Sequence, residues 1–171
     1  MQSYYKTCLT TAFRRLTGTI PSVGKYIDFL DISNNSLTGE LPTTVFKNAR
    51  MTTVNLSNNK LSGSIKGSFV TGFDSIGRIY LNNNRLTGII PTQFAELEYI
   101  DLSGNDLHGS IPLNVLTSTS IKSLNLAGNR LSGTLPSEAC VFAANGATCD
   151  LSGNKYVHCI TEINLIILYV V

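Results

Sequence analysis

Aliphatic residues recur along the chain at a spacing that fits neither a helix nor an alternating strand. In "LNLAGNRLSGTLP", residues 124–136, leucines stand at 124, 126, 131 and 135, and an asparagine stands among them. The pattern returns at 29–42, 54–66, 79–91 and 100–112, and in weaker form at 149–159. Only its second half, "RLTGTIP", appears at 15–21. Repetition at a period of about 20–29 residues predicts a solenoid in which each unit forms one coil.

One asparagine occupies the same position in every copy of the pattern. From the N-terminus onward, these asparagines are Asn35, Asn59, Asn84, Asn105, Asn129 and Asn154. In each coil, a short strand would point its leucines inward, and a tight turn would follow it. An asparagine side chain both donates and accepts hydrogen bonds, so it can satisfy the buried turn of its own coil and that of the next coil. We therefore predict a structural ladder of stacked asparagines rather than a ligand site.

The second half of each unit reads "LTGELP", "LSGSIK", "LTGIIP", "LHGSIP" or "LSGTLP". Its glycine allows the chain to bend, and its proline fixes an extended segment and opposes helix formation. Over about residues 15–159 the pattern resembles that of the plant-type leucine-rich repeat family, LxxLxLSxNxLxGxIP. Its members include receptor-kinase ectodomains, polygalacturonase-inhibiting proteins and surface proteins of protists.

This resemblance implies an α/β-type solenoid, wound as a right-handed superhelix. We expect a parallel concave sheet of five or six short strands, 3-10 segments, and a second short sheet formed by the LxGxIP stretches. The predicted organisation is a degraded N-terminal repeat or cap at 1–26, about five repeats at 27–145, and a C-terminal cap with an apolar tail at 146–171.

Three of the four cysteines lie close to the C-terminus: Cys140, Cys149 and Cys159. They resemble the disulfide-bearing C-terminal caps of extracellular family members, which implies an oxidising compartment. Cys149 with Cys159 is the favoured pair, and Cys140 with Cys159 is the alternative. Zinc is the rival interpretation, with His158 as a further ligand. Because no C-x2-4-C pair is present, we expect neither a metal nor another cofactor.

Composition narrows the choice of partner and location. The net charge of +2 gives no basic stripe for nucleic acid. No signal peptide is evident, and the final "INLIILYVV" falls short of the roughly 20 apolar residues that span a membrane. We expect an extracellular or cell-surface fragment, associated with a membrane only if an anchor lies beyond this chain. Sequons at Asn34 and Asn55 are candidate glycosylation sites.

The residues between the inward leucines should face solvent on the concave sheet. Most are small or acidic, but four are the aromatic or arginine types that anchor protein interfaces: Phe29, Arg78, Tyr80 and Tyr99. We predict non-catalytic binding of a protein, peptide or glycan there. The alternatives are an ectodomain piece of a receptor-like kinase and a structural or ice-binding protein. No catalytic constellation and no kinase motif appear in the 171 residues.

Overall fold

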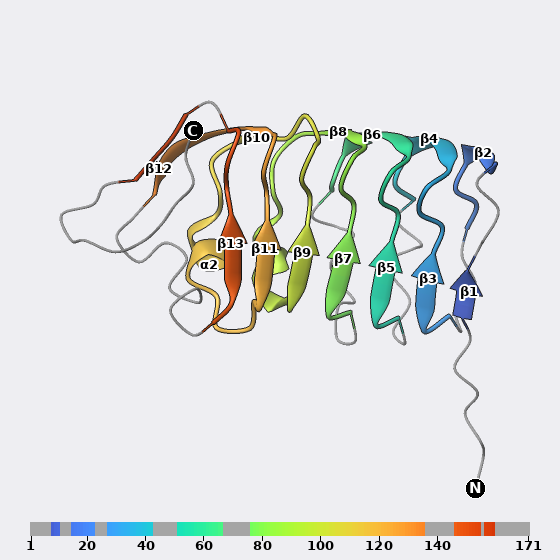
Figure 1. Ribbon diagram of the computed structural model, residues 1–171, viewed down its shortest axis with the longest axis horizontal. Coiled ribbons are helices and arrows are strands. Elements are labelled where there is room, and N and C mark those ends of the chain that lie inside the picture. Colours follow the sequence, from blue (N-terminus) through green and yellow to red (C-terminus); the bar gives the residue numbers. More distant parts are fainter. Residues whose placement is uncertain are drawn as a thin grey trace, which may run out of the picture.

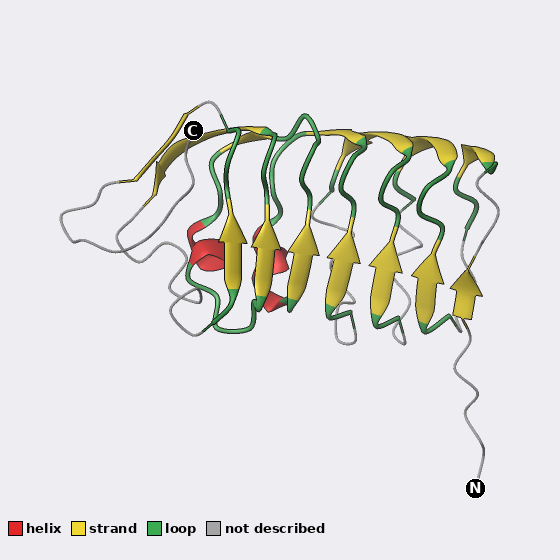
Figure 2. Ribbon diagram, in the orientation of Figure 1, coloured by secondary structure: helices red, strands yellow, loops and turns green. Residues whose placement is uncertain are grey.

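The chain forms a solenoid whose coils stack in sequence order (Figure 1). The computed structural model describes residues 8–10, 15–22, 27–42, 51–66, 76–135, 146–154 and 156–159. Each coil begins with a concave strand, turns sharply, and continues into a second short strand at the solenoid's edge (Figure 2). The predicted parallel-sheet solenoid, with little helix, is confirmed.

The concave sheet has seven parallel strands in the described part of the chain. They are β1 (Cys8–Thr10), β3 (Phe29–Asp31), β5 (Thr53–Asn55), β7 (Arg78–Tyr80), β9 (Tyr99–Asp101), β11 (Ser123–Asn125) and β13 (Thr148–Asp150). The sequence predicted five or six. The additional strand is β1, which pairs in register with β3 although its unit has lost the leucine pattern. Backbone hydrogen bonds to a neighbouring strand need no particular side chain, so a degraded unit can still extend the sheet.

The LxGxIP stretches form two further parallel sheets along one edge of the solenoid, which we call the lateral sheets. One contains β2 (Thr17–Thr19), β4 (Ser36–Glu40), β6 (Lys60–Ser64) and β8 (Arg85–Thr87). The other contains β10 (His108–Gly109), β12 (Arg130–Leu135) and β14 (Tyr156–Cys159). The second short sheet that the motif predicted is therefore present, divided in two between the third and fourth asparagine-bearing coils.

Two short helices lie on the side of the coils opposite the concave strands (Figure 2). The 3-10 helix η2 (Thr92–Glu96) follows Pro91, and α2 (Leu113–Leu116) follows Pro112. Both prolines are extended, with ψ of 138° and 135°. The sequence interpretation supposed that the proline opposes helix formation, but in both coils a helix follows it. Because its missing N–H is not needed at a helix start, the helix begins at the next residue. Neither helix is long and apolar enough to cross a membrane, and no other helix of the described residues is.

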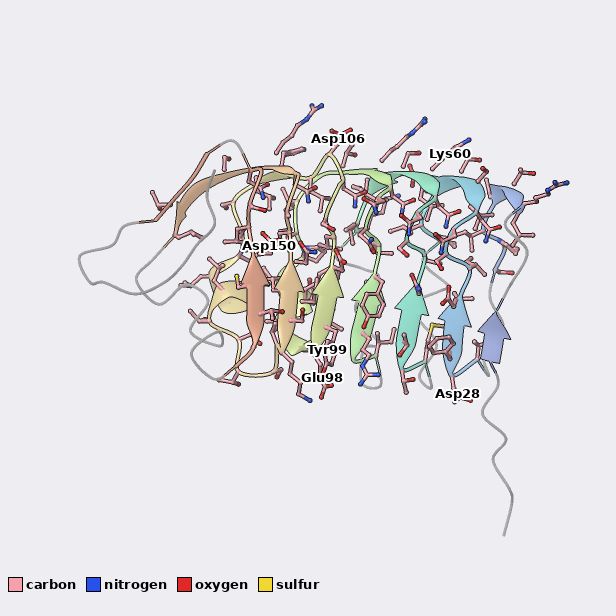
Figure 3. All side chains as sticks on the ribbon, viewed as in Figure 1. Asp28, Lys60, Glu98, Tyr99, Asp106 and Asp150 are labelled. Atoms are coloured by element: carbon pink, nitrogen blue, oxygen red, sulfur yellow. The ribbon has the colours of Figure 1, made fainter. Side chains whose placement is uncertain are left out.

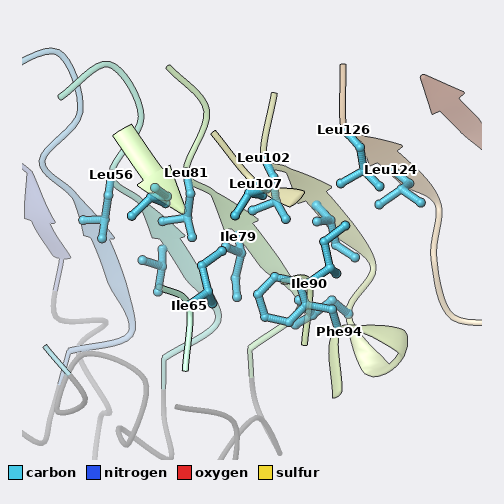
Figure 4. Close-up of a cluster of buried hydrophobic side chains, with 14 of the residues drawn as sticks. Leu56, Ile65, Ile79, Leu81, Ile90, Phe94, Leu102, Leu107, Leu124 and Leu126 are labelled. Carbon is cyan, nitrogen blue, oxygen red and sulfur yellow. The ribbon is translucent and has the colours of Figure 1, made fainter. Parts of the chain in front are cut away.

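The core is a continuous stack of aliphatic side chains between the sheets and the helices (Figure 4). The concave strands β3, β5, β7, β9 and β11 bury their middle residues, which are Leu30, Val54, Ile79, Ile100 and Leu124. This follows from the alternation of side chains along a strand. Phe94 from η2 is the large aromatic of the core, at 1% exposure. Coils therefore adhere through leucine and isoleucine layers that repeat once per unit.

The asparagine of each unit lies in the turn after its concave strand and makes both local and inter-coil hydrogen bonds. In Asn105, Oδ1 accepts from the N–H of Leu86 at 3.0 Å. Its Nδ2 donates to the carbonyl oxygens of Leu81, Leu102 and Ser103 at 3.0–3.2 Å. Corresponding bonds are made by Asn35, Asn59, Asn84, Asn129 and Asn154.

These bonds reach the preceding coil, whereas the sequence pointed to the next one. The reason is the direction of the backbone N–H that needs a partner. In Leu86 and Leu107 this group points forward, toward the coil that comes later, so only the later asparagine can accept its hydrogen bond. Among the described residues, no buried side-chain nitrogen or oxygen lacks a hydrogen bond.

The residue just before each ladder asparagine has a left-handed backbone. The φ angles are 55–67° at Asn34, Asn58, Asn83, Gly104, Gly128 and Gly153. Glycine and asparagine adopt this conformation at least cost. Every copy of the pattern has asparagine or glycine at this position, so the sequence itself indicates the left-handed turn.

Candidate functional site

Two columns of side chains lie on the concave face of the sheet, in the arrangement that the repeat predicted, and all but the buried Thr53 are at least partly exposed. Strand register aligns Arg78 with Tyr99 and Tyr80 with Asp101. The outer column contains Phe29, Thr53, Arg78, Tyr99, Ser123 and Thr148. The column next to the turn contains Asp31, Asn55, Tyr80, Asp101, Asn125 and Asp150. In the structure each residue therefore lies beside its counterpart from the next coil.

The acids and amides of the second column cap the turns. In Asp101, Oδ1 accepts from the backbone N–H of Ser103 at 3.0 Å and from its hydroxyl at 2.7 Å. The same bond to the N–H two residues later is made by Asp31, Asn55, Asn125 and Asp150. This is the local turn that Asp and Asn side chains stabilise. The composition of this column is therefore explained by the fold.

Tyr80 is the exception in the turn-capping column. A phenol side chain is too long and rigid to reach the N–H of Asn82, and no such bond forms. The coil gives up a hydrogen bond that five others make, worth about 0.5–1.5 kcal/mol. In return it places a half-buried aromatic ring on the concave surface. A residue that departs from the local rule at the cost of stability points to function.

Arg78, Tyr80 and Tyr99 lie together on β7 and β9. The guanidinium carbon of Arg78 stands 4.8 Å from the centre of the Tyr99 ring, within the range of a cation–π interaction. Arg78 forms no ion pair within the described part of the chain. Its hydrogen-bond donors thus remain available above an aromatic base. We call Arg78, Tyr80 and Tyr99 the concave patch.

Phe29, the fourth predicted site residue, lies apart from this patch. It sits on β3, and β5 separates it from Arg78. Two strand spacings of about 4.8 Å place it roughly 10 Å away. The intervening residue of its column is Thr53, which is only 7% exposed. The structure therefore brings three of the four predicted residues together, with Phe29 at the margin.

An ion pair borders the concave patch at the start of the strands (Figure 3). Lys122 Nζ lies 2.8 Å from Glu98 Oε1, in the residue before Tyr99. The hydrogen bond from Lys122 lowers the pKa of Glu98, and the positive charge of Arg78 adds to this effect. The same bond raises the pKa of Lys122. Glu98 therefore stays ionised and remains paired with Lys122. Arg78, the cation of the concave patch, forms no ion pair among the described residues.

The two sequons differ in how accessible their amides are. Asn34 is exposed, and its left-handed backbone fits the turn. Asn55 lies on the concave sheet, where its Nδ2 donates to Asp31 Oδ2 at 3.1 Å. N-glycosylation would modify this nitrogen, so a glycan on Asn55 would break a part-buried contact between two coils, whereas Asn34 Nδ2 donates only to the neighbouring Ser33 Oγ at the surface, at 3.1 Å. Asn34 is the better placed of the two candidate glycosylation sites.

Cys149 takes a leucine position in β13, packs against the core and is disulfide-bonded. A disulfide sulfur is not a thiolate, so Cys149 cannot serve as a zinc ligand in this state. The side chains of its predicted partner Cys159, of Cys140, which was the alternative partner of Cys159, and of the further zinc candidate His158 lie outside the described residues. The side chain of Cys8 and the apolar tail also lie outside the described residues.

Matches to family models agree with this architecture. Models described as leucine-rich repeats match residues 49–107, 26–48 and 120–142. Receptor-like protein 7 of Arabidopsis thaliana is 35% identical over 116 residues, which cover 66% of this chain and 12% of that protein. This chain spans 12–15% of the length of the first curated relatives that it matches.

Solved structures share both fold and sequence with the chain. The ectodomain of the Arabidopsis receptor kinase HAESA, solved with a peptide hormone ligand, is 31% identical with a TM-score of 0.68. The match covers 81% of this chain and 25% of that one. A plant ice-binding protein is 28% identical with a TM-score of 0.66, and the match covers 82% of this chain and 46% of that one. The chain is thus similar to repeat regions that lie outside any catalytic domain.

Proposed function

Because the chain belongs to the plant-type leucine-rich repeat family, we propose that it is a recognition module that binds an extended peptide segment on its concave face. The binding is non-catalytic and centres on Arg78, Tyr80 and Tyr99. The observation that carries the proposal is Tyr80, which stands where five other coils keep a turn-capping Asp or Asn.

The chemistry of the concave patch suits a peptide. Arg78 offers unpaired donors to a carboxylate or a backbone carbonyl, and the Tyr99 ring beneath it holds the guanidinium in place. Tyr80 offers an apolar ring with a hydroxyl that has no partner within the described residues. Tyrosine and arginine are over-represented among interface residues whose truncation costs 2 kcal/mol or more.

The relatives support a cell-surface setting. The HAESA ectodomain binds a peptide hormone, and the matched parts of the receptor-like proteins are the same kind of repeat. The disulfide at Cys149 fits an oxidising compartment. We therefore place the module outside the cell, as part of a receptor-like protein or of a receptor-like kinase.

Selection from a random peptide display library tests the proposal while the natural ligand is still unidentified. The wild-type protein should enrich a peptide consensus, and synthetic peptides of that consensus should bind with measurable affinity. Tyr80→Asn should weaken binding by about thirtyfold or more, the equivalent of the 2 kcal/mol typical of an interface anchor. The new asparagine restores the missing turn bond, so the variant should fold at least as well as the wild type.

Leu113→Ser provides the matched control. Leu113 is 60% exposed on α2, away from the concave sheet, and should be neutral for binding. If Tyr80→Asn and Tyr99→Ala both fold and retain full affinity, the concave patch is not the binding site. If the library yields no consensus with the wild-type protein, peptide recognition itself is wrong.

Ice binding is less well supported despite the similarity to an ice-binding protein. An ice-binding surface would need a regular array of threonine or similar side chains. The concave columns mix acids, tyrosines and an arginine. The lateral sheets do carry serine and threonine columns, but Glu40, Ile89 and His108 interrupt them.

A further inference from the structure

Basic side chains gather at one repeat position that the concave site does not use. The position immediately after the ladder asparagines is occupied by Ser36, Lys60, Arg85, Asp106, Arg130 and Lys155, of which Lys155 lies outside the described residues. Arg15 holds the corresponding position in the degraded unit. Four of the seven lysines and arginines of the described residues fall at this single position. We call Arg15, Lys60, Arg85 and Arg130 the basic ridge.

The fold fixes these residues at one edge of the solenoid, one repeat position per coil. Lys60, Arg85 and Arg130 are each followed by a leucine that is fully buried and whose backbone N–H is bound by the next ladder asparagine. Leu16, which follows Arg15 in the degraded unit, has the same bond but is 37% exposed. Since the leucine points inward, its neighbour points outward. Figure 3 shows Lys60 and Asp106 at the edge of the solenoid opposite to Tyr99 and Glu98. The lateral strands pair with a stagger of two residues, so Lys60 lies in register with Thr38 and Arg85 lies in register with Ser62.

The cations of the ridge differ from the others in lacking partners. Outside the ridge, Lys66 pairs with Glu40 and Lys122 pairs with Glu98, while Arg78 lies over Tyr99. On the ridge, only Arg130 has an ion pair, with Asp106 at 3.0 Å. Arg15, Lys60 and Arg85 are exposed and form no ion pair within the described part of the chain. A row of unneutralised cations attracts a polyanion.

The flanking columns indicate which kind of polyanion fits. On one side lie the exposed amides of Asn34, Asn58 and Asn83, two of which are joined by a hydrogen bond of 2.8 Å. The hydroxyls of Thr38 and Ser62 lie directly beside Lys60 and Arg85 in the register of the lateral strands, and Thr17 and Thr87 hold the same repeat position. Amides and hydroxyls match the hydroxyl groups of sugars, and none of these columns carries the aromatic side chains on which nucleic-acid bases stack.

We propose that the basic ridge binds an acidic polysaccharide, a linear chain of uronate sugars whose carboxylates meet Arg15, Lys60 and Arg85. The amide and hydroxyl columns on either side receive the sugar hydroxyls. The ridge is a second site, separate from the concave patch and independent of the proposed peptide binding. A polymer that lies along it can run from coil to coil at the lateral edge, because the same repeat position recurs in successive coils.

Binding of the whole chain to immobilised polygalacturonate, measured by biolayer interferometry, tests the proposal. The wild-type protein should bind the de-esterified polymer, and the affinity should fall as salt rises. The fully methyl-esterified polymer, which has the same sugars without the charge, should not bind. The double variant Lys60→Ala/Arg85→Ala should lose at least about tenfold in affinity, because it removes two adjacent charges of the row. All four side chains of the ridge are exposed, so their variants should keep the wild-type melting temperature.

Lys66→Ala is the matched control, since Lys66 is also exposed on the lateral side but is neutralised by Glu40. It should leave binding unchanged. Asp106→Lys should strengthen binding, because it replaces the acid of the row by a cation and frees Arg130. An equal loss in Lys66→Ala, or equal binding of the esterified polymer, would overturn the ridge as the site. Equal binding of polyglutamate or of single-stranded RNA would overturn the assignment to an acidic polysaccharide.

Discussion

Replacement of Asn105 by alanine tests the asparagine ladder most directly. The side chain is 6% exposed and makes four hydrogen bonds. Two of its acceptors, the carbonyls of Leu81 and Leu102, keep a second ladder asparagine as donor after the change. The N–H of Leu86 has no other acceptor and becomes a buried donor without a partner. The loss is therefore dominated by one orphaned group.

An unsatisfied buried donor costs about 1–3 kcal/mol, and the lost bond to Ser103 adds to it. We expect a destabilisation of about 2–3 kcal/mol. For a domain of this size, that corresponds to a decrease in melting temperature of about 5–10 °C, followed by circular dichroism. Urea unfolding at constant temperature should report the same difference through its midpoint.

Asn83→Gly is the control for this experiment. Asn83 is an exposed asparagine in the equivalent turn, and glycine preserves its left-handed backbone. It should change stability by less than about 0.5 kcal/mol, as surface substitutions usually do. If Asn105→Ala melts at the wild-type temperature, or if Asn83→Gly costs as much, the ladder does not hold the coils together as argued.

Three further predictions concern the turns, the surface and the cap. Gly104→Ala should destabilise by about 1–2 kcal/mol, because its φ is 62° and an added Cβ would lie 2.5 Å from a neighbouring amide oxygen. Gly77→Ala should be tolerated, because an added Cβ there would meet only the Glu98 side chain, at 3.8 Å or more; thermal melts of both variants compare them. Lys122→Ala should raise the pKa of Glu98 toward its ordinary value in an NMR titration. Since the folded pKa of Glu98 is lowered, the pair stabilises above the carboxyl's ordinary pKa and is lost as pH falls through the folded value. Because the pKa of Lys122 is raised, its contribution persists below the ordinary lysine pKa and is lost as pH rises through the folded value. Reduction of the disulfide at Cys149 should lower stability by about 2–4 kcal/mol, and peptide mapping without reductant should identify its partner; protein with a fully reduced Cys149 at its source would contradict the extracellular placement.

The period and the leucine spacing predicted most of the fold, because each repeat position has one physical task. A leucine that recurs at every coil can only be core, so the concave strands and their solvent columns followed from the sequence alone. β1 was missed because its unit lacks the leucines, and strand pairing depends on the backbone rather than on those side chains. The starts of η2 and α2 were missed because proline was read only as an obstacle to helices.

The residue types of the candidate site were predictable from the sequence, but the difference between Tyr80 and the turn-capping residues of its column was not. Tyr80 stood out in the sequence as an aromatic, yet its significance depends on the turn bonds made by Asp31, Asn55 and the others of its column. Those bonds become visible only once the turn geometry is determined. The basic ridge was missed for a different reason. Its successive members lie 25–45 residues apart in the chain, and a net charge of +2 conceals their alignment.

The direction of the ladder bonds has a consequence for how the chain assembles during synthesis. The leucine N–H that follows the turn of each coil is accepted by an asparagine 19–23 residues later in the chain. The N–H of Leu86 needs Asn105, and that of Leu61 needs Asn84. The side-chain acceptor for this leucine N–H in a newly made coil is therefore supplied by the coil that follows it. At about 5–20 residues per second, formation of this hydrogen bond trails the ribosome by roughly one to five seconds. The hydrogen bonds of the asparagine ladder can thus form only in the order in which the coils are translated, from the N-terminal coil onward.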